Sequence, residues 1–505
     1  MNRRRLAAAL LTGLLTAAPA RAALTEGPRL TAIYDTILSA RFDQADAALK
    51  RACPPAPLEA CAALNAVSVW WRIQQDPNSR ALDGRLNDLA TAALVAGDAW
   101  TRREPHRAEA WFYLAGSYAP LVQWRVLRGE RLAAAREGKR IKDALERALQ
   151  LDQTLADAYF GIGLYHYYAD VAPAAAKILR WLLFLPGGDR VKGLEEMLTA
   201  RERGVLLRGE ADYQLHLIYL WYEHNPMRSV ELLEGLDSRY PSNPIFLRRL
   251  AETNDTWLHD RPAAAAAWQS LVDRAREGRV FESARTETIA RLGLASQLDG
   301  MYETDRAVDH LEIVVGNRGA GIPRALVAQA HLQLGLAHDR LGERERAVAA
   351  YRSAIDESGD RSEIALRARQ GLSQNPSRTV TEAYRLSLDG WRAFEKGALP
   401  RAATSLARAV DRDPADPIAQ YRYARILDAS GDVARARQQL DRLIAARTAP
   451  AFVLASALVS YGALLERAGE RSRAIESYRR AAEVVGSEPT ARDQARAALK
   501  RLGAA

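Results

Sequence analysis

The sequence has 505 residues, more than one ordinary hydrophobic core accommodates, so several domains or an extended repeat array are expected. Hydrophobic residues make up 48% and charged residues 26%, a globular composition that excludes wholesale disorder and a fibrous chain. The formal net charge of +9 falls to +5 without the four arginines of the first 22 residues, and charges alternate along the chain, so no nucleic-acid partner is indicated.

The N-terminus has the three parts of a secretory signal. Residues 1–5 carry three arginines, residues 6–18 are apolar, and Ala20-Arg21-Ala22 places small residues at the two positions that a signal peptidase reads. The apolar run is shorter than the roughly 20 residues that cross a bilayer, so we expect cleavage rather than an uncleaved anchor. The mature chain then begins near Ala23, with no cysteine there to carry a lipid, and its predicted location is periplasmic or secreted.

Two cysteines, Cys53 and Cys61, flank a proline-rich connector. In an oxidising compartment an even pair in a loop is expected to form a disulfide. The alternatives are two free thiols or half of a metal site, but the sequence has no CxxC and no histidine pair placed to complete a zinc site. No metal site and no cofactor is therefore predicted.

The N-terminal half reads as a series of helices. Residues 41–52 have the pattern of the second helix of a hairpin, and residues 108–118 and 156–163 that of first helices. A further unit covers residues 213–241 and ends in a Pro- and Asn-containing turn. Between them, residues 171–193 form an apolar stretch interpreted either as a buried core helix or, through Trp181 to Leu185, as a peripheral membrane contact; it is too short to span a bilayer.

Three glycines of the C-terminal half reveal an internal repeat. Gly397, Gly431 and Gly469 are 34 and 38 residues apart. Each follows a small residue by seven positions and precedes an alanine by five, and a bulky apolar residue comes four positions after that alanine. The small residues are Gly390, Ala424 and Gly462, the alanines are Ala402, Ala436 and Ala474, and the same frame fits once upstream at Gly335, Gly342, Ala347 and Tyr351.

This frame has a physical reason and resembles that of the tetratricopeptide repeat (TPR) family. A small residue lets the two helices of a hairpin approach closely, and a glycine accepts the backbone angles of the turn between them. One hairpin cannot bury its own apolar face, so neighbours must stack. The resemblance implies an all-α solenoid of TPR-type hairpins, regular in its C-terminal repeats and divergent in its N-terminal half.

The resemblance also implies a binding groove, because the first helix of each TPR hairpin lines a concave face. Aromatic side chains in such a groove are suitable anchors for peptides or sugars. The alternative is that they pack between repeats. The groove-facing residues implied in this way are Phe112, Phe160, Tyr167, Tyr168, Trp221 and Tyr222 in the N-terminal half, and Trp391, Phe394 and Arg425 in the C-terminal half.

Composition divides the chain into four parts. These are a signal peptide (1–22), a divergent TPR-like helical array (23–275), middle TPR-like repeats (276–371) and, after the polar connector 371–378, a three-repeat unit with a capping helix (379–505).

No catalytic motif is found: GxxxxGK[ST], HExxH, GxSxG and a full GxGxxG are all missing from the sequence, so no catalytic residue is assigned. The sequence therefore predicts a non-enzymatic, exported scaffold that binds protein partners or peptide segments in the cell envelope, with no membrane span after signal cleavage. The alternatives are a glycan- or peptide-binding module that uses an aromatic-lined groove, and accessory repeats of an envelope enzyme.

Overall fold

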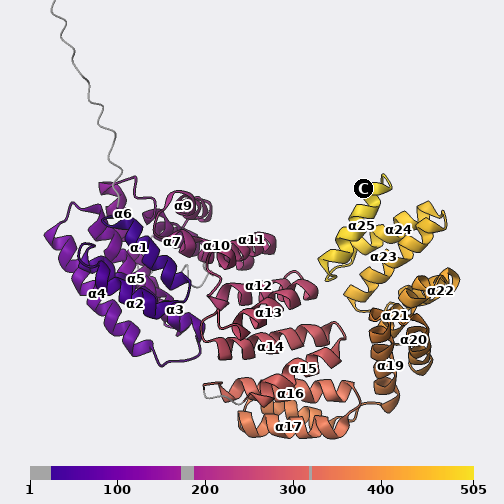
Figure 1. The fold of residues 1–505 in the computed structure, drawn as a ribbon. Helices are drawn as coiled ribbons and strands as arrows, with labels where there is room; N and C mark the ends of the chain where they lie inside the picture. The colour runs from indigo at the N-terminus through magenta and orange to yellow at the C-terminus, as the bar shows by residue number, and fades with distance from the viewer. Residues whose placement is uncertain (1–23, 172–186, 318–320, 505) are drawn as a thin grey trace, which may run out of the picture. The chain divides into compact units, whose positions relative to one another are not determined.

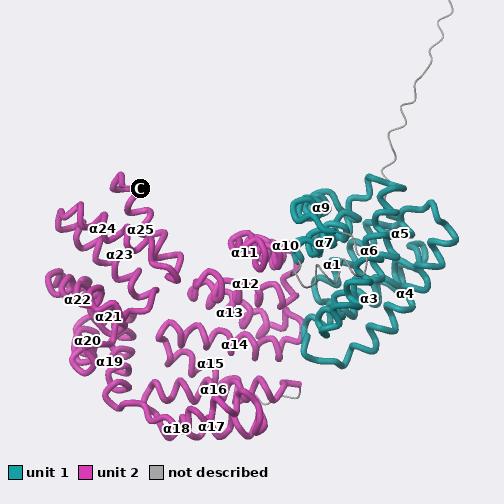
Figure 2. The backbone as a smooth tube through the Cα atoms, turned by 180° about the vertical axis from the view of Figure 1, so that it is seen from behind, with its two compact units in different colours: residues 1–214 teal, residues 215–505 magenta. Residues whose placement is uncertain are grey.

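The computed structural model describes residues 24–171, 187–317 and 321–504. Within these ranges it consists of helices joined by short turns, with no strand, which confirms the predicted all-α solenoid class. The chain divides into two compact units, residues 1–214 and 215–505 (Figures 1 and 2). Each unit is described by itself.

The first unit is built from antiparallel helices that pack on their neighbours in sequence. Its helices are α1 (Gly27–Leu38), α2 (Phe42–Ala52), α3 (Leu58–Gln75), α4 (Asp83–Arg103), α5 (Ala108–Leu127), α6 (Arg131–Leu151), α7 (Ala158–Val171), α9 (Arg190–Arg203) and the first half of α10 (Arg208–Trp221).

The predicted disulfide is confirmed. Cys53 and Cys61 are bonded, with their Cα atoms 6.4 Å apart, and they join the end of α2 to the first turn of α3. The link closes the proline-rich connector, which fixes the path of the chain between the two helices.

The described chain begins in a polar cluster that we call the N-terminal clasp, formed by Thr25, Arg107 and Glu109. The backbone N–H of Thr25 donates to Glu109 Oε1 at 2.7 Å, and its hydroxyl donates to Oε2 at 2.9 Å. Arg107 donates to both partners, to Glu109 Oε2 at 2.8 Å and to the Thr25 hydroxyl at 2.9 Å. Leu24 beside it is only 8% exposed, so the fold is anchored from its first described residues onward.

A buried carboxylate ties three helices of the first unit together. Glu210, at the start of α10, accepts hydrogen bonds from the Tyr34 hydroxyl at 3.0 Å and from Trp71 Nε1 at 3.1 Å. Burial raises the pKa of Glu210 and outweighs these bonds, which lower it. The cluster connects α1, α3 and α10 across long sequence separations.

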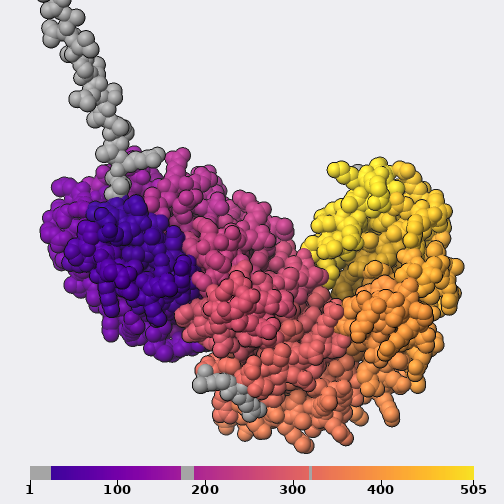
Figure 3. Space-filling model, in the orientation of Figure 1, coloured from indigo at the N-terminus to yellow at the C-terminus, as the bar shows by residue number. Residues whose placement is uncertain are grey.

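The second unit consists of successive helical hairpins. Its helices are α11 (Pro226–Arg239), α12 (Pro244–Thr256), α13 (Arg261–Arg276), α14 (Ser283–Gly300), α15 (Thr304–Gly316), α16 (Arg324–Arg340), α17 (Arg344–Ser358), α18 (Glu363–Ser373), α19 (Arg378–Glu395), α20 (Leu399–Arg412), α21 (Pro417–Ala429), α22 (Val433–Ala446), α23 (Ala451–Arg467), α24 (Arg471–Glu483) and α25 (Pro489–Arg501). In the space-filling view this unit is hollowed between α11 and its C-terminal helices (Figure 3).

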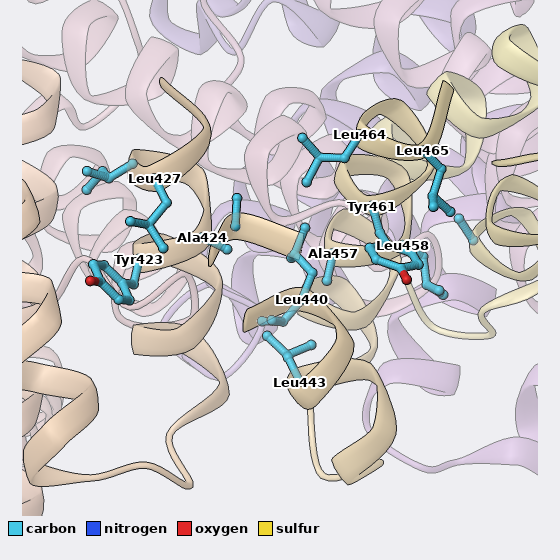
Figure 4. Packing of buried hydrophobic residues seen from close by; sticks show 14 of the residues in the cluster. Tyr423, Ala424, Leu427, Leu440, Leu443, Ala457, Leu458, Tyr461, Leu464 and Leu465 are labelled. Carbon is cyan, nitrogen blue, oxygen red and sulfur yellow. The ribbon is translucent and has the colours of Figure 1, made fainter. Parts of the chain in front are cut away.

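The small residues predicted from the repeat lie where the helices of a hairpin approach most closely. A Cβ atom added to Gly390 would lie 2.6 Å from Leu406 Cγ, and one added to Gly462 would lie 2.7 Å from the Tyr478 ring. Both contacts are shorter than side chains tolerate, so the glycines are required by the packing. The resulting core runs through the last repeats, where side chains of α21, α22 and α23 interlock (Figure 4).

Two predictions concern segments that the structure does not decide. The residues proposed for a peripheral membrane contact, Trp181 to Leu185, lie outside the described residues, although α9 does begin at Arg190 with Asp189 as its N-cap. The predicted boundary at residues 371–378 falls inside the second unit and stays a prediction. Among the helices described, none is long and apolar enough to cross a membrane.

Candidate functional site

The hairpin turns of the second unit share one backbone feature. In each, the residue before the N-cap of the second helix has a positive φ. In four turns this is one of the glycines of the sequence repeat, Gly342, Gly397, Gly431 and Gly469, with φ between 73° and 82°.

Three earlier turns carry a side chain at this place: His224 (φ 49°), His259 (φ 54°) and Tyr302 (φ 62°). A side chain in the left-handed region costs about 1–2 kcal/mol, so these residues keep this conformation only because the surrounding structure holds it.

An exposed aromatic pair lies beside the first two of these turns. Trp221 ends α10 and is 58% exposed, and Trp257 is the C-cap of α12 and half-buried. Their ring centroids are 4.9 Å apart at an interplanar angle of 89°. We call Trp221 and Trp257 the tryptophan pair. Tyr222 follows directly and is also exposed, so the structure leaves both aromatic residues predicted in this helix accessible.

The two turns next to the tryptophan pair have the same design. The N–H of Asn225 donates to the carbonyl six residues back, and the N–H of Asp260 does the same. Each of these residues then caps the following helix with its side chain. Trp257 was not predicted from the sequence, although its spacing of 36 residues from Trp221 is close to the repeat length and would have identified it.

The third turn is covered by residues of the C-terminal repeats (379–505). We call residues 302–306 the Tyr302 turn. The Tyr302 ring lies 6.1 Å from the ring of Tyr384 in α19 and 6.1 Å from that of Phe452 in α23. Thr304 donates to Asp299 and is itself bonded to the Tyr384 hydroxyl at 2.7 Å, so the Tyr384 hydroxyl is the donor there.

Ion pairs connect the same turn to α19. Arg392 binds both carboxylate oxygens of Asp305 at 2.7 Å, and Arg306 contacts Glu395 at 3.1 Å. Burial raises the pKa of Asp305, but the hydrogen bonds and positive charge of Arg392 outweigh it and hold that pKa below its ordinary value. Bidentate pairs of this kind fix geometry as well as adding energy.

A buried arginine completes the contact. Arg422 of α21 is 4% exposed and donates to the Tyr302 carbonyl at 2.8 Å and to the Ser387 hydroxyl at 3.1 Å. Its guanidinium lies over the Trp391 ring, 5.6 Å from the centroid. Burial lowers the pKa of Arg422, so its place in the fold depends on these polar and aromatic neighbours.

The predicted residues of the C-terminal half therefore fall into two groups. Trp391 and Phe394 are half-buried, have ring centroids 5.2 Å apart and belong to the surroundings of the Tyr302 turn. Arg425 is exposed and donates to the Tyr421 hydroxyl at 3.1 Å.

Most of the residues predicted in the first unit do not line an accessible groove. Phe112, Phe160 and Tyr167 are buried, and Tyr168 is half-buried. The reason lies in close helix packing: a Cβ on Gly163 of α7 would lie 2.6 Å from the carbonyl oxygen of Gly193 in α9. With α9 this close, the part of α7 around Tyr167 is covered, since a Cβ on Gly193 would also lie 3.0 Å from Tyr167 Cβ. Phe112 lies in α5 and Phe160 at the start of α7, and both are buried as packing residues would be.

The part of the chain that the structure describes contains no group of three or more His, Cys, Asp or Glu side chains placed to hold a metal ion.

A family model described as tetratricopeptide repeat matches residues 393–460. Residues 393–460 carry tetratricopeptide repeats. The match covers α20, α21, α22 and part of α23, the region in which the glycine frame of the sequence is most regular. No curated protein matches the sequence.

Three solved structures are similar at low TM-scores. A tetratricopeptide repeat protein from Parabacteroides merdae ATCC 43184 is 15% identical over 57% of this chain and 97% of its own, with a TM-score of 0.26. The TPR domain of P58(IPK) is 12% identical over 87% and 97%, with a TM-score of 0.23. The human IFIT1 dimer with m7Gppp-AAAA is 14% identical over 77% and 81%, with a TM-score of 0.28. Likeness at this level carries no information on function.

The TPR class has a usual role in proteins. Its members are generally non-catalytic scaffolds that bind protein partners, and a TPR fold implies binding of that kind. The identity of a partner has to be sought in the surfaces of this chain.

Proposed function

We propose that the mature TPR chain is a non-catalytic scaffold that binds segments of protein partners in the cell envelope, from a periplasmic or secreted location. The tryptophan pair carries this proposal. Large aromatic side chains exposed together are typical anchors of protein interfaces, because they bury much apolar area and lose little conformational freedom.

The geometry of the pair favours a protein segment over a glycan. The two indole rings are nearly perpendicular, so they form an angled surface and not a flat platform. A sugar ring stacks best on one flat aromatic face, whereas an apolar side chain fits the angle between two rings. Exposed Met227, at the start of α11, adds a flexible apolar side chain to the same turn.

The proposed location rests on two observations. The Cys53–Cys61 disulfide is of the kind that persists in oxidising compartments. Residues 1–5 and 6–18 have the pattern of an export signal.

The binding proposal is tested with the immobilised mature chain, residues 23–505, and detergent-solubilised cell envelopes. Wild type is compared with Trp221→Ala/Trp257→Ala and with Leu366→Ala, a matched control because Leu366 is 60% exposed in the same unit. We expect a discrete protein to be retained by wild type and by the control but lost with the double variant. Retention of a glycan fraction instead, or equal capture by all three chains, would refute the proposal.

Cell fractionation with N-terminal sequencing tests the location. We expect the chain outside the cytoplasm, beginning near Ala23. Full-length protein confined to the cytosol would contradict it.

A further inference from the structure

The Tyr302 turn lies against the helices that line the groove of a TPR array. In each TPR hairpin the first helix faces the concave side, and α19, α21 and α23 are the first helices of the three C-terminal repeats. All three contact the turn. The contacting residues are Tyr384, Arg392 and Glu395 of α19, Arg422 of α21 and Phe452 of α23.

These contacts are of the kinds by which a protein recognises a peptide. Arg422 binds a backbone carbonyl, and Arg392 binds a carboxylate with two parallel hydrogen bonds. The rings of Tyr384 and Phe452 both lie beside the aromatic side chain of Tyr302. A main-chain contact, a charged anchor and an apolar anchor together define both the direction and the register of a bound segment, which here is a turn followed by the first residues of α15.

The turn has the backbone of the later glycine turns but carries a tyrosine in place of the glycine. The N–H of Tyr302 donates to the Asp299 carbonyl at 3.0 Å, and the next N–H donates to the carbonyl five residues back at 2.8 Å. Gly397 and the residue after it make the same two bonds. The four later hairpins use glycine here, so tyrosine is a locally unfavourable choice, and its contacts with the C-terminal repeats supply the compensating interaction.

We propose that the Tyr302 turn is an internal ligand of the C-terminal repeats, and that its release opens a site for a partner peptide with an aromatic residue followed three positions later by a carboxylate. Tyr302 and Asp305 provide that spacing within the chain. The inference rests on the proposed function, since it supposes that the protein binds protein segments. It uses a surface separate from the tryptophan pair.

The test uses the mature chain and a fluorescein-labelled peptide with the sequence of residues 297–312, with binding followed by fluorescence anisotropy. The released variant is Tyr302→Gly/Asp305→Ala. His259→Gly is the matched control, because it removes a positive-φ side chain from another turn at an exposed position. We expect the released variant to bind the peptide at least tenfold more tightly than wild type or the control does, and the further change Arg392→Glu to abolish this gain.

Two results would overturn the proposal: no peptide binding by the released variant, or equal binding by the released variant and wild type. Circular dichroism first checks that helix content is kept. If the double variant loses it, Tyr302→Gly alone serves, because glycine is the usual residue at this turn. Failure here leaves the capture assay with the tryptophan pair unaffected, so the two proposals succeed or fail separately.

Discussion

Two kinds of hairpin turn in the second unit place a side chain at a position of positive φ, but they direct that side chain differently. The turns at His224 and His259 keep their side chains exposed and lie beside an accessible aromatic pair. The turn at Tyr302 directs its side chain against the C-terminal repeats. The difference shows that departures from the repeat pattern are informative. Where another residue replaces the turn glycine, the turn either lies beside an accessible aromatic surface or packs against another part of the array.

The largest expected effect comes from removing the buried guanidinium of Arg422. Arg422→Ala leaves the Tyr302 carbonyl and the Ser387 hydroxyl without their donor, so the free energy of unfolding of the second unit should fall by about 2–4 kcal/mol. Arg425→Ala, three residues along the same helix and exposed, should change it by less than about 0.5 kcal/mol. Urea denaturation of both variants decides; equal effects would mean that the contact with the Tyr302 turn contributes nothing.

Next in size is the replacement of the two turn residues by glycine. Tyr302→Gly relieves backbone strain but loses two ring contacts, with an expected net loss of about 1–2 kcal/mol. His259→Gly relieves the same strain at an exposed site, so stability should stay the same or rise by up to about 1 kcal/mol. Melting curves of the two variants show whether each substitution raises or lowers the stability. If both change it in the same direction, the proposed difference between the Tyr302 and His259 turns is wrong.

A smaller effect is expected for the tryptophan pair. Trp257→Ala removes one perpendicular ring contact from a half-exposed site, so the free energy of unfolding should fall by about 1 kcal/mol, while partner capture is lost. The measurement is thermal melting together with the envelope capture assay. A large loss of stability with normal capture would show that the pair is structural.

The smallest effect is a dependence on pH at the Tyr302 turn. Asp305 faces Arg392 and Arg306, with Glu303 and Glu395 nearby, and its pKa in the folded chain lies below the unfolded value. A depressed pKa stabilises the folded state at pH above the ordinary aspartate value of about 4, and this contribution is lost as the pH falls through the lowered pKa.

Hydrogen exchange in residues 302–306 should therefore speed up more between pH 6 and pH 3 in wild type than in Asp305→Asn, after correction for the intrinsic rates. An identical change in both chains would exclude a contribution from this carboxylate.

The sequence predicted the fold class and the C-terminal frame because those features depend on side-chain size. Gly390 and Gly462 mark close helix approaches that no larger residue permits, and Gly397 and Gly431 mark turns with positive φ. The frame was lost upstream because a search for turn glycines does not find His224, His259 or Tyr302. Their left-handed backbone is held by the surrounding hairpin, and residue type alone does not identify it.

The candidate site was only partly predictable for a related reason. Helical phase places Phe112 and Trp221 alike on first helices, but it does not tell which of these faces a later helix covers. The separation depends on long-range packing, such as the approach of α7 and α9 at Gly163. The internal contact of Tyr302 with α19 and α23 joins residues 82 and 150 positions apart, which no local pattern encodes.

The N-terminal clasp has a consequence for how the chain acquires its fold. In a solenoid most contacts join neighbours, so folding can follow synthesis repeat by repeat. Here Thr25 forms its hydrogen bonds with Glu109, which is synthesised 84 residues later. Tyr34 forms its hydrogen bond with Glu210, which is synthesised 176 residues later. In a chain that emerges N-terminus first, α1 therefore lacks this partner until α10 has appeared, so the first unit completes its packing late in synthesis.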